Sequence, residues 1–402
     1  MNKIAKAFVC VALATALVAG LAACSSAPAS GSSAESAAPA SSAAASTEAA
    51  GSASAEGGLT EVTFVSPTAL QSYDYLAIYA ADYLGYFKEE GIKVKYVEQL
   101  GADDVKMVAS GTAQFAYPSP GVYNSCIDAG ITNVKAIMNY DSVQIFGVAL
   151  NKSAGIKDWA DLKGKDVALY NEAWSSLMSP LLDKAGMKLE DVNMVSYGDG
   201  RYEAVKSGKA PAMATWLSEY YQLVGQGYDL DYLDGNKICP QVSNSLVTSD
   251  ELIQSNPDLV KKFVRAMTKA MYFCYLNPDA AADITLLTCP NLQIDWKGAQ
   301  GATKGDVMQI FGTSEEEQKK TIEAGIGLFD MTKAQNAADN LLKAGAISTA
   351  IDTSKYYSND FVDTSWDKAK VEADAKAYTC TSPQYTKDGA TAASPSVSAS
   401  AS

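Results

Sequence analysis

Hydrophobic and polar residues alternate between residues 60 and 97 in a pattern that predicts a strand, a helix and a second strand. Residues 62–65 have the character of a buried strand, which Ser66-Pro67 ends. Tyrosines then recur at the spacing of one helical face, at positions 75, 79, 83 and 86. Gly91 is placed to end the helix, and the residues after it alternate again as a strand. The stretch therefore predicts a βαβ unit.

The order of strand, polar loop and helix recurs along the chain until about residue 250. Strands are predicted at 114–117, 134–138, 143–150, 166–169, 192–196, 212–215 and 243–248. Such alternation is typical of parallel sheets with helices on both faces, and ligands of these folds bind beyond the carboxyl ends of the strands. The expected fold class is therefore α/β, with parallel sheets flanked by helices.

The last third of the chain is predicted to be mainly helical. Helices are expected at 256–273, 278–287, 314–327, 332–344 and 365–377. Residues 298–305 contain more glycine than a stable helix favours, because each glycine in a helix costs about 1 kcal/mol relative to alanine. We therefore expect a loop at residues 298–305.

The amino terminus has the features of a lipoprotein signal peptide over residues 1–23. Lys3 and Lys6 precede a short apolar run, and Leu21-Ala22-Ala23-Cys24 follows it. This pattern predicts lipid attachment to Cys24 and anchorage at the extracytoplasmic face of the cell membrane. An ordinary secretory signal with an incidental cysteine is the alternative.

Two segments are too poor in apolar residues to form a core. Residues 24–58 consist almost wholly of Ser, Ala, Gly, Pro and Glu, and residues 389–402 repeat that composition. Segments of this kind cannot bury enough apolar surface to offset the entropy of ordering. We expect a disordered tether and a disordered tail, with a folded part between them that is too large for one ordinary core.

Charge and composition exclude several classes of function. The formal net charge is −14, which disfavours nucleic acid as a partner. The chain has no histidine, so it lacks Ser-His and Cys-His catalytic pairs and histidine-based zinc sites. Its two arginines, Arg201 and Arg265, are the only candidates for bidentate recognition of an anion. No enzymatic activity, cofactor or metal site is expected.

The cysteines that follow Cys24 are odd in number, at positions 126, 239, 274, 289 and 380. An exported chain can pair some of them, and Cys274 with Cys289 is one candidate pair among several. Free buried thiols are the alternative.

Five motifs in order resemble a known family of binding proteins. They are Gly-Tyr-Phe-Lys-Glu-Glu-Gly-Ile-Lys-Val at 85–94, Gly-Thr-Ala-Gln-Phe-Ala at 111–116, Gly-Ile-Lys-Asp-Trp-Ala-Asp-Leu-Lys-Gly-Lys-Asp-Val-Ala at 155–168, Ala-Val-Lys-Ser-Gly-Lys-Ala-Pro-Ala at 204–212, and Asn-Pro-Asp at 256–258. The chain resembles type-II extracytoplasmic substrate-binding proteins of ABC importers over about residues 60–290. The family captures thiamine-precursor pyrimidines, nitrate, sulfonates and taurine.

The resemblance implies a two-lobed periplasmic binding protein of type II with a ligand cleft between the lobes. The first lobe would comprise residues 59–150 and 241–388, and the second residues 151–240. The implied partners are a small-molecule ligand and an ABC transporter permease, with the protein itself a monomer. A eukaryotic branch of the family is enzymatic and uses an active-site histidine, which this chain lacks. A membrane-anchored sensor with the same fold is an alternative to a transport receptor.

The resemblance also implies which side chains face the ligand, because loops at the carboxyl ends of strands line such a cleft. The implied residues are Ser66, Gln71, Tyr73, Tyr117, Ser119, Tyr140, Asp141, Asn171, Glu172, Trp174, Ser175, Tyr197, Arg201, Trp216 and Glu219. Ser119 and Ser175 are also predicted to cap helices.

Several of these residues allow a second interpretation. Trp174 and Trp216 could stack on a planar ligand or cover the core of the second lobe. Arg201 could hold an anion or be neutralised on the surface by Asp199 or Glu203. The predicted lining is rich in aromatic, hydroxyl and amide groups and poor in arginine. It favours a planar organic molecule, such as a thiamine-precursor pyrimidine or another heterocycle, with nitrate, a sulfonate or taurine as the alternative.

Overall fold

The structure, a computed structural model, describes residues 58–66, 72–99 and 103–388, and all of them belong to one compact unit. The predicted signal peptide, the lipidation of Cys24, the tether up to residue 57, the tail at 389–402 and the candidate Gln71 lie outside the described residues. Within the described ranges, no helix combines the length and apolar character needed to cross a bilayer.

Sheet A contains five strands in the order β2-β1-β3-β10-β4. Their bounds are β1 Thr60–Ser66, β2 Ile92–Glu98, β3 Phe115–Ala116, β4 Val134–Asn139 and β10 Ser245–Ser249. β1 is parallel to β2 and β3, whereas β10 is antiparallel to β3 and β4. The sheet is therefore mixed rather than wholly parallel, because β10 returns the chain from the other sheet.

Sheet B also contains five strands, in the order β7-β6-β8-β5-β9. Their bounds are β5 Phe146–Asn151, β6 Asp166–Leu169, β7 Asn193–Ser196, β8 Ala212–Trp216 and β9 Leu230–Asp234. β5 is antiparallel to β8 and β9, while β6 is parallel to β7 and β8. The pattern did not predict β9, in which charged residues interrupt the apolar alternation.

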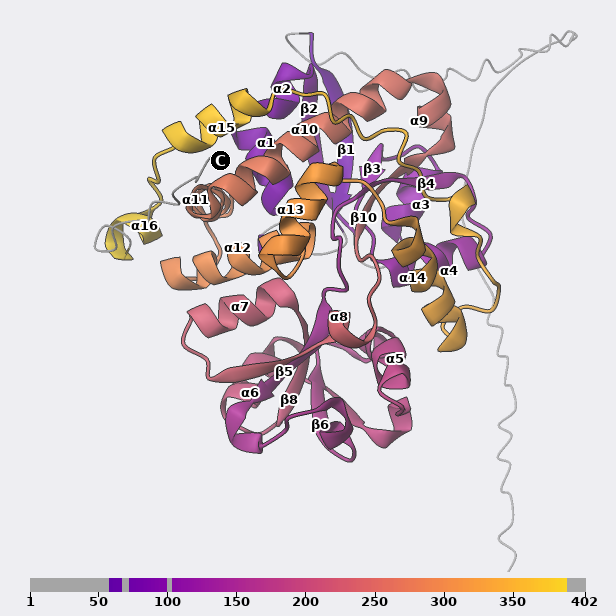
Figure 1. The fold of residues 1–402 in the computed structure, drawn as a ribbon, viewed down its shortest axis with the longest axis vertical. Helices are drawn as coiled ribbons and strands as arrows, with labels where there is room; N and C mark the ends of the chain where they lie inside the picture. The colour runs from indigo at the N-terminus through magenta and orange to yellow at the C-terminus, as the bar shows by residue number, and fades with distance from the viewer. Residues whose placement is uncertain (1–57, 67–71, 100–102, 389–402) are drawn as a thin grey trace, which may run out of the picture. The chain divides into compact units, whose positions relative to one another are not determined.

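Helices cover both sheets (Figure 1). Those between the strands are α1 Leu76–Tyr83, α2 Tyr86–Glu89, α3 Asp103–Ala109, α4 Pro120–Asp128, α5 Ser175–Lys184, α6 Arg201–Lys206, α7 Leu217–Gly225 and α8 Gly235–Ile238. Those after β10 are α9 Asp250–Ser255, α10 Pro257–Leu276, α11 Pro278–Thr288, α12 Trp296–Phe311, α13 Glu315–Ala324, α14 Met331–Lys343, α15 Lys368–Ala377 and α16 Pro383–Asp388. The predicted carboxyl-terminal helices are confirmed to within a few residues.

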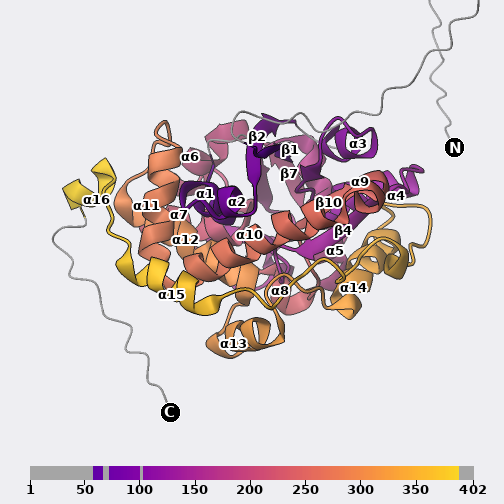
Figure 2. The same cartoon turned by 90° about the horizontal axis from the view of Figure 1, so that it is seen from above.

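The predicted βαβ unit is present, with a short 3-10 turn, η1 (Tyr73–Tyr75), ahead of α1. Tyr75, Tyr79 and Tyr86 are buried in the core, whereas Tyr83 is half exposed. The helix packs against α10, which runs along α1 and α2 in Figures 1 and 2. α10 begins where the sequence predicted, because Asn256 caps it and Pro257 occupies its first turn.

The expectation of a loop at residues 298–305 is wrong, since this stretch lies inside α12. α12 packs against α7, and the two helices lie side by side in Figure 1. A β-carbon at Gly301 would lie 2.2 Å from the Tyr221 carbonyl oxygen, and one at Gly305 would lie 2.3 Å from Ser218 Cα. The glycines lower intrinsic helix stability but allow the two backbones to approach closely.

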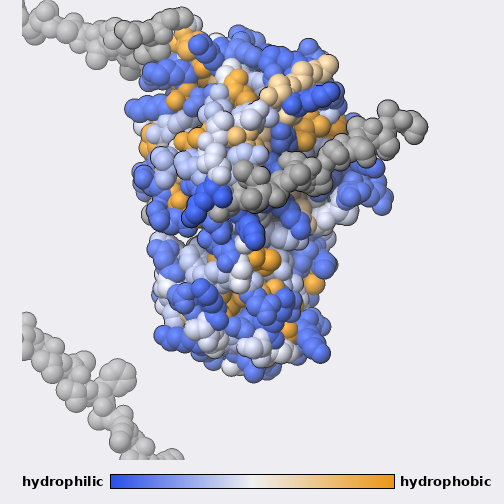
Figure 3. All heavy atoms as spheres, turned by 90° about the vertical axis from the view of Figure 1, so that its left-hand side faces the viewer, coloured by the Kyte–Doolittle hydropathy of each residue, from blue (hydrophilic) through white to orange (hydrophobic). Residues whose placement is uncertain are grey.

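None of the five cysteines in the described part of the chain forms a disulfide, so the candidate pair Cys274–Cys289 does not form. Four of the five are buried, in accord with the alternative of buried thiols. The surface shown in Figure 3 is largely hydrophilic, and its hydrophobic positions are scattered.

Candidate functional site

The two chain segments that cross between the sheets are hydrogen-bonded to each other. The Asp141 N–H donates to the Asn244 carbonyl at 3.0 Å, and the Ser243 N–H donates to the Asp141 carbonyl at 2.9 Å. Tyr140 and Asp141 follow β4 directly, so they lie at the predicted position between the sheets. We call this pair of segments the crossing. Its backbone hydrogen bonds fix the position of Tyr140 and Asp141.

The Asp141 carboxyl group is buried among tyrosines. Tyr117 Oη donates to Asp141 Oδ2 at 2.6 Å, and the Tyr117 and Tyr140 rings meet edge to face at 4.7 Å. Burial raises the pKa of Asp141 to about 7, and the negative charge of Asp74 adds to the rise, while the Tyr117 hydrogen bond opposes it. Asp141 Oδ1 has no hydrogen-bond partner. The structure thus brings three predicted site residues together.

A second buried carboxyl group, Asp306 on α12, lies near Asp141. Burial raises its pKa well above the usual value, and the charges of Asp74 and Asp141 raise it further. The Gln309 side chain connects Asp306 on α12 to the start of α7. Its Nε2 donates to Asp306 Oδ1 at 3.2 Å, and its Oε1 accepts from the Ser218 N–H, at the start of α7, at 2.8 Å.

Several buried polar atoms around Asp306 lack hydrogen-bond partners. They are Asp306 Oδ2, Tyr73 Oη, Ser218 Oγ and Thr303 Oγ1. The Ser218 hydroxyl lies close enough to lower the pKa of Asp306, although the two groups do not reach hydrogen-bond geometry. The charge of Asp306 in turn helps to raise the pKa of the Tyr73 phenol, after burial as the main cause. A buried polar group without a partner costs about 1–3 kcal/mol, so this arrangement calls for an explanation.

Arg201 is buried inside the sheet B half and does not lie on the surface. Its Nη2 bonds to a carboxylate oxygen of Glu219, which is itself buried, and to Tyr202 Oη at 2.8 Å. Tyr202 and Thr215 also donate to Glu219. The predicted surface partner Asp199 is 3.8 Å away and exposed, so Glu219 is the main partner of the guanidinium.

Aromatic rings surround the guanidinium and extend toward α7. Arg201 Cζ lies 5.3 Å from the centroid of the Trp174 ring and 5.4 Å from that of Tyr170. Trp174 and Trp216 meet edge to face at 5.8 Å. Both tryptophans are partly exposed, and Trp174 packs against the core of the sheet B half. Trp216 is two residues before Ser218, which links this aromatic group to the buried carboxyl groups.

The remaining predicted residues have separate surroundings. Ser66 is buried and bonds to Tyr75, and Ser119 caps α4 by accepting from the Val122 N–H at 3.4 Å, as predicted. Ser175 is not the cap of α5. The helix begins at Ser175 itself, one residue earlier than a cap at this position requires, and the Ser175 hydroxyl donates to the Glu172 carbonyl at 2.6 Å. Asn171 and Glu172 are exposed, and Tyr197 is partly exposed under the Lys209 ammonium.

The sequence pattern did not identify five polar residues of this region, Asp74, Ser218, Thr303, Asp306 and Gln309. Three of them lie on α12, in or just after the stretch that was expected to be a loop. A helix with Thr303, Asp306 and Gln309 at steps of three residues places polar groups on one face. If residues 298–305 had been assigned to a helix, this spacing would have predicted a polar face at these three positions.

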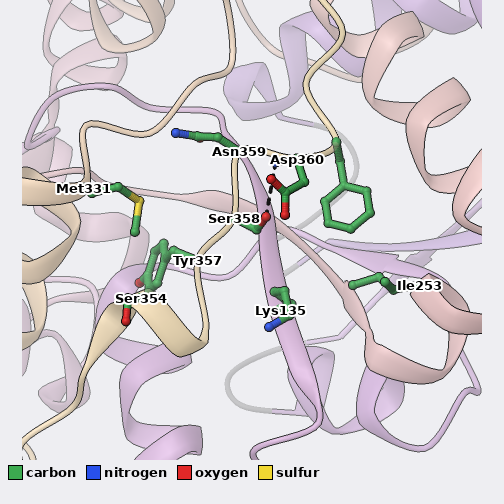
Figure 4. Close-up of a pocket in the computed structure, with 9 residues that line it drawn as sticks. Lys135, Ile253, Met331, Ser354, Tyr357, Ser358, Asn359 and Asp360 are labelled. Carbon is green, nitrogen blue, oxygen red and sulfur yellow. Dashed lines mark hydrogen bonds between the residues drawn. The ribbon is translucent and has the colours of Figure 1, made fainter.

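Two depressions in the described surface lie elsewhere. One has a volume of about 470 Å³ and is lined by Lys135, Ile253, Met331, Ser354 and residues 357–361 (Figure 4). The other has about 180 Å³ and is bordered by residues 127–128, 349–352 and 355–356. Both depressions lie along the carboxyl-terminal segment that pairs with the edge strand β4 through Ala136 and Tyr357. Within this segment the Asp360 N–H donates to Ser358 Oγ at 3.1 Å (Figure 4). Neither contains a predicted site residue.

The part of the chain that the structure describes holds no group of three His, Cys, Asp or Glu side chains arranged around a possible ion. The three carboxyl groups whose charges interact near the crossing come from separate segments, with Asp74 in η1, Asp141 in the crossing and Asp306 in α12.

Comparison with known proteins assigns the family. The family described as NMT1/THI5 like matches residues 72–281, slightly more than half of the chain, and the chain belongs to this family. The fold is the periplasmic binding protein type II fold, with two mixed five-stranded sheets.

Relatives of known sequence include both binding proteins and enzymes. The riboflavin-binding protein RibY of Chloroflexus aurantiacus is 26% identical over 319 residues, which cover 77% of this chain and 88% of the relative. The 4-amino-5-hydroxymethyl-2-methylpyrimidine phosphate synthase of Aspergillus parasiticus is 26% identical over 236 residues, 55% of this chain and 68% of the enzyme.

Among solved structures, the alkanesulfonate-binding protein SsuA from Xanthomonas axonopodis pv. citri, bound to MOPS, superposes with a TM-score of 0.55. The identity is 13%, and the match covers 74% of this chain and 98% of that protein. At this identity the likeness supports the fold and not the ligand.

Proposed function

We propose that the protein is the extracytoplasmic solute receptor of an ABC importer and captures a small planar organic molecule between its two sheets. The family membership and the similarity to RibY support a binding role. The absence of histidine from the sequence argues against the histidine-dependent chemistry of the enzymatic branch. A thiamine-precursor pyrimidine or a similar heterocycle is the proposed ligand.

The observation that carries the choice of ligand class is the engagement of both arginines in ion pairs. Arg201 is paired with Glu219. Arg265 donates from Nε and Nη2 to Glu90 at 2.9 and 2.8 Å, and from Nη1 to Asp363 at 2.7 Å. A sulfonate or nitrate needs a concentrated set of donors, and neither guanidinium is available to provide one. Aromatic rings at the strand ends suit a planar ligand instead.

A thermal-shift screen of pyrimidines, other aromatic heterocycles, sulfonates and nitrate tests this proposal. We expect planar heterocycles to stabilise the protein, and calorimetry of the best compound should show at least a tenfold weaker Kd in Trp174→Ala, because stacking contributes about 1–3 kcal/mol per ring. Tyr83→Ala is the matched control, since Tyr83 is an exposed aromatic residue of the sheet A half. Tight binding of a sulfonate or nitrate, with no response to heterocycles, would contradict the proposal.

Membrane attachment and lobe closure are separate parts of the proposed function. Metabolic labelling with a palmitate analogue should tag the wild-type protein and leave Cys24→Ala unlabelled. Small-angle scattering should show a smaller radius of gyration with bound ligand, if the segments near 140–150 and 240–248 act as a hinge. Equal labelling of both proteins would exclude lipidation at Cys24. An unchanged radius of gyration during proven binding would exclude lobe closure.

A further inference from the structure

The five unpartnered polar atoms near the crossing come from four separate segments. We call them the junction cluster: Asp141 Oδ1 from the crossing, Tyr73 Oη from η1, Ser218 Oγ from α7, and Thr303 Oγ1 and Asp306 Oδ2 from α12. Every one of these side chains is less than 6% exposed. Their segments follow the carboxyl ends of β1, β4 and β8 or pack against them, which is where ligands bind in folds of this kind.

The charges in and around the junction cluster are mainly negative. Asp74 and Asp141 are the strongest charged influences on Asp306, and each raises its pKa. The other titratable groups that interact with Asp141 or Asp306 are Tyr73, Tyr117, Tyr140 and Cys274. Lys333 approaches the crossing, but its ammonium donates to the Ser142 carbonyl at 3.3 Å. Two buried carboxyl groups therefore each keep an oxygen without a donor, in a region of like charge.

We propose that the ligand carries a positively charged planar nitrogen group, such as an amidinium or a protonated aminoheterocycle, which donates hydrogen bonds to Asp141 Oδ1 and Asp306 Oδ2. This inference rests on the proposed function and narrows its ligand class. Charge-assisted hydrogen bonds to carboxylates are stronger than neutral ones, and a bound cation supplies the missing donors and the missing positive charge together. Tyr73 and Ser218, whose hydroxyls also lack partners, orient the group from two sides.

The proposal also predicts how binding depends on pH. Burial raises the pKa of Asp141 to about 7, so a large fraction of this group is protonated below neutral pH in the ligand-free protein. A cation binds best when both carboxyl groups are ionised. Its affinity should therefore rise between pH 6 and pH 8, and binding should release protons.

Three probes of one shape and different charge test the proposal: benzamidine as a cation, benzamide as a neutral isostere and benzoate as an anion. Calorimetry with the full-length protein at pH 8 should give a Kd for benzamidine at least tenfold below that for benzamide, with benzoate weaker still. Asp141→Asn and Asp306→Asn should each remove that preference. Asp104→Asn is the matched control, because Asp104 in α3 is also fully buried with an unpartnered Oδ2. It should keep the preference.

The outcomes separate this inference from the function on which it rests. Benzamide binding as tightly as benzamidine, or a hit list of neutral and anionic compounds only, overturns the cation and leaves the receptor function standing. No stabilisation by any compound contradicts the receptor function itself. Stabilisation by MgCl2 or CaCl2 alone, lost in the two Asn variants, assigns the cluster to a metal ion and overturns the organic cation.

A ligand-free measurement keeps the test informative if a variant binds poorly for another reason. Without ligand, Asp306→Asn should leave the Tm at pH 8 unchanged or raise it, because burial among like charges disfavours the ionised form of this carboxyl group. A lower Tm, with the benzamidine preference kept, would mean that Asp306 has a structural role, and the proposal would be wrong.

Discussion

Two buried groups of charged side chains differ in how completely they are partnered. In the sheet B half, Glu219 receives hydrogen bonds from Arg201, Tyr202 and Thr215, and its charge is matched by the guanidinium. In the junction cluster, Asp141 and Asp306 each have one oxygen bonded and one without a partner. Both groups are equally buried.

The difference teaches that burial alone does not identify a ligand site. A buried ion pair whose charges neutralise each other is a structural feature, although Arg201 Nε has no hydrogen-bond partner, and breaking the pair leaves an uncompensated charge. A buried carboxyl group with an unused acceptor has capacity left for another molecule. On this criterion Arg201, which was predicted to line the cleft, has a structural partner, and Asp141 and Asp306 are the residues that we propose for ligand contact.

The largest change in stability is expected from breaking the ion pair between Arg201 and Glu219. Glu219→Ala should lower the free energy of unfolding by about 3–5 kcal/mol, because it leaves the Arg201 guanidinium buried without a counter-charge. Urea unfolding followed by circular dichroism measures this. Asp199→Ala is the control, since Asp199 faces the same arginine at 3.8 Å but its side chain is 86% exposed. It should change the free energy by less than about 0.5 kcal/mol, and equal effects of the two variants would mean that Glu219 is not the main partner.

The next largest change in stability is expected from disturbing the contact between α7 and α12, the two helices that carry Ser218, Thr303 and Asp306. Gly305→Ala should cost about 1–3 kcal/mol in the free energy of unfolding, because its β-carbon would lie 2.3 Å from Ser218 Cα. Gly200→Ala is the matched control, with φ −63° and no atom within 4 Å of the added carbon. If urea unfolding shows no difference between the two variants, α7 and α12 do not pack this closely.

A third effect concerns pH and the unpartnered carboxyl groups. Burial raises the pKa of both Asp104 and Asp141 to about 7. The folded protein therefore retains protons that the unfolded chain releases above a pH of about 4. Since the folded state then binds more protons, the free energy of unfolding should fall as the pH rises from about 4 to about 7.

Substitution assigns that pH dependence to particular residues. Asp141→Asn should reduce the slope and gain about 1 kcal/mol of unfolding free energy at pH 7.5, because the amide carries no charge to desolvate. Asp103→Asn is the control on α3, where the hydrogen bond from Lys106 lowers the pKa of an exposed carboxyl group. It should give no gain, and a loss of stability in Asp141→Asn would show that the carboxylate is already satisfied.

The smallest effect is expected where the two halves meet through exposed charges. Lys343 on α14 lies 2.7 Å from Asp183 on α5, and the side chains are 62% and 37% exposed. Exposed ion pairs contribute about 0–1 kcal/mol, so Lys343→Ala should change the free energy of unfolding by less than about 0.5 kcal/mol. Lys320→Ala, which breaks a pair within α13, is the control. A larger loss of stability in Lys343→Ala than in Lys320→Ala would mean that the Lys343–Asp183 ion pair stabilises the contact between the two halves.

Much of the fold could be predicted from local pattern. The first strand and helix, the cap at Asn256 and the helix at Pro278 lie where the sequence placed them. These features depend on residues that are neighbours in the chain, such as a side-chain oxygen and an N–H three positions later. The placement of Tyr117, Tyr140 and Asp141 near one another followed from the rule that strand ends gather at one edge.

The sequence by itself determined the alternation of strands and helices, the lack of histidine chemistry and the scarcity of arginine. Only the tertiary structure decided that Glu219 neutralises Arg201, that glycines 301 and 305 lie within a helix, and that Asp306 joins Asp141. The physical reason is separation along the chain. The cost of a glycine or a buried charge depends on the atoms that pack against it. Here those atoms lie 80 or more residues away along the chain for the glycines, and more than 160 for the two aspartates.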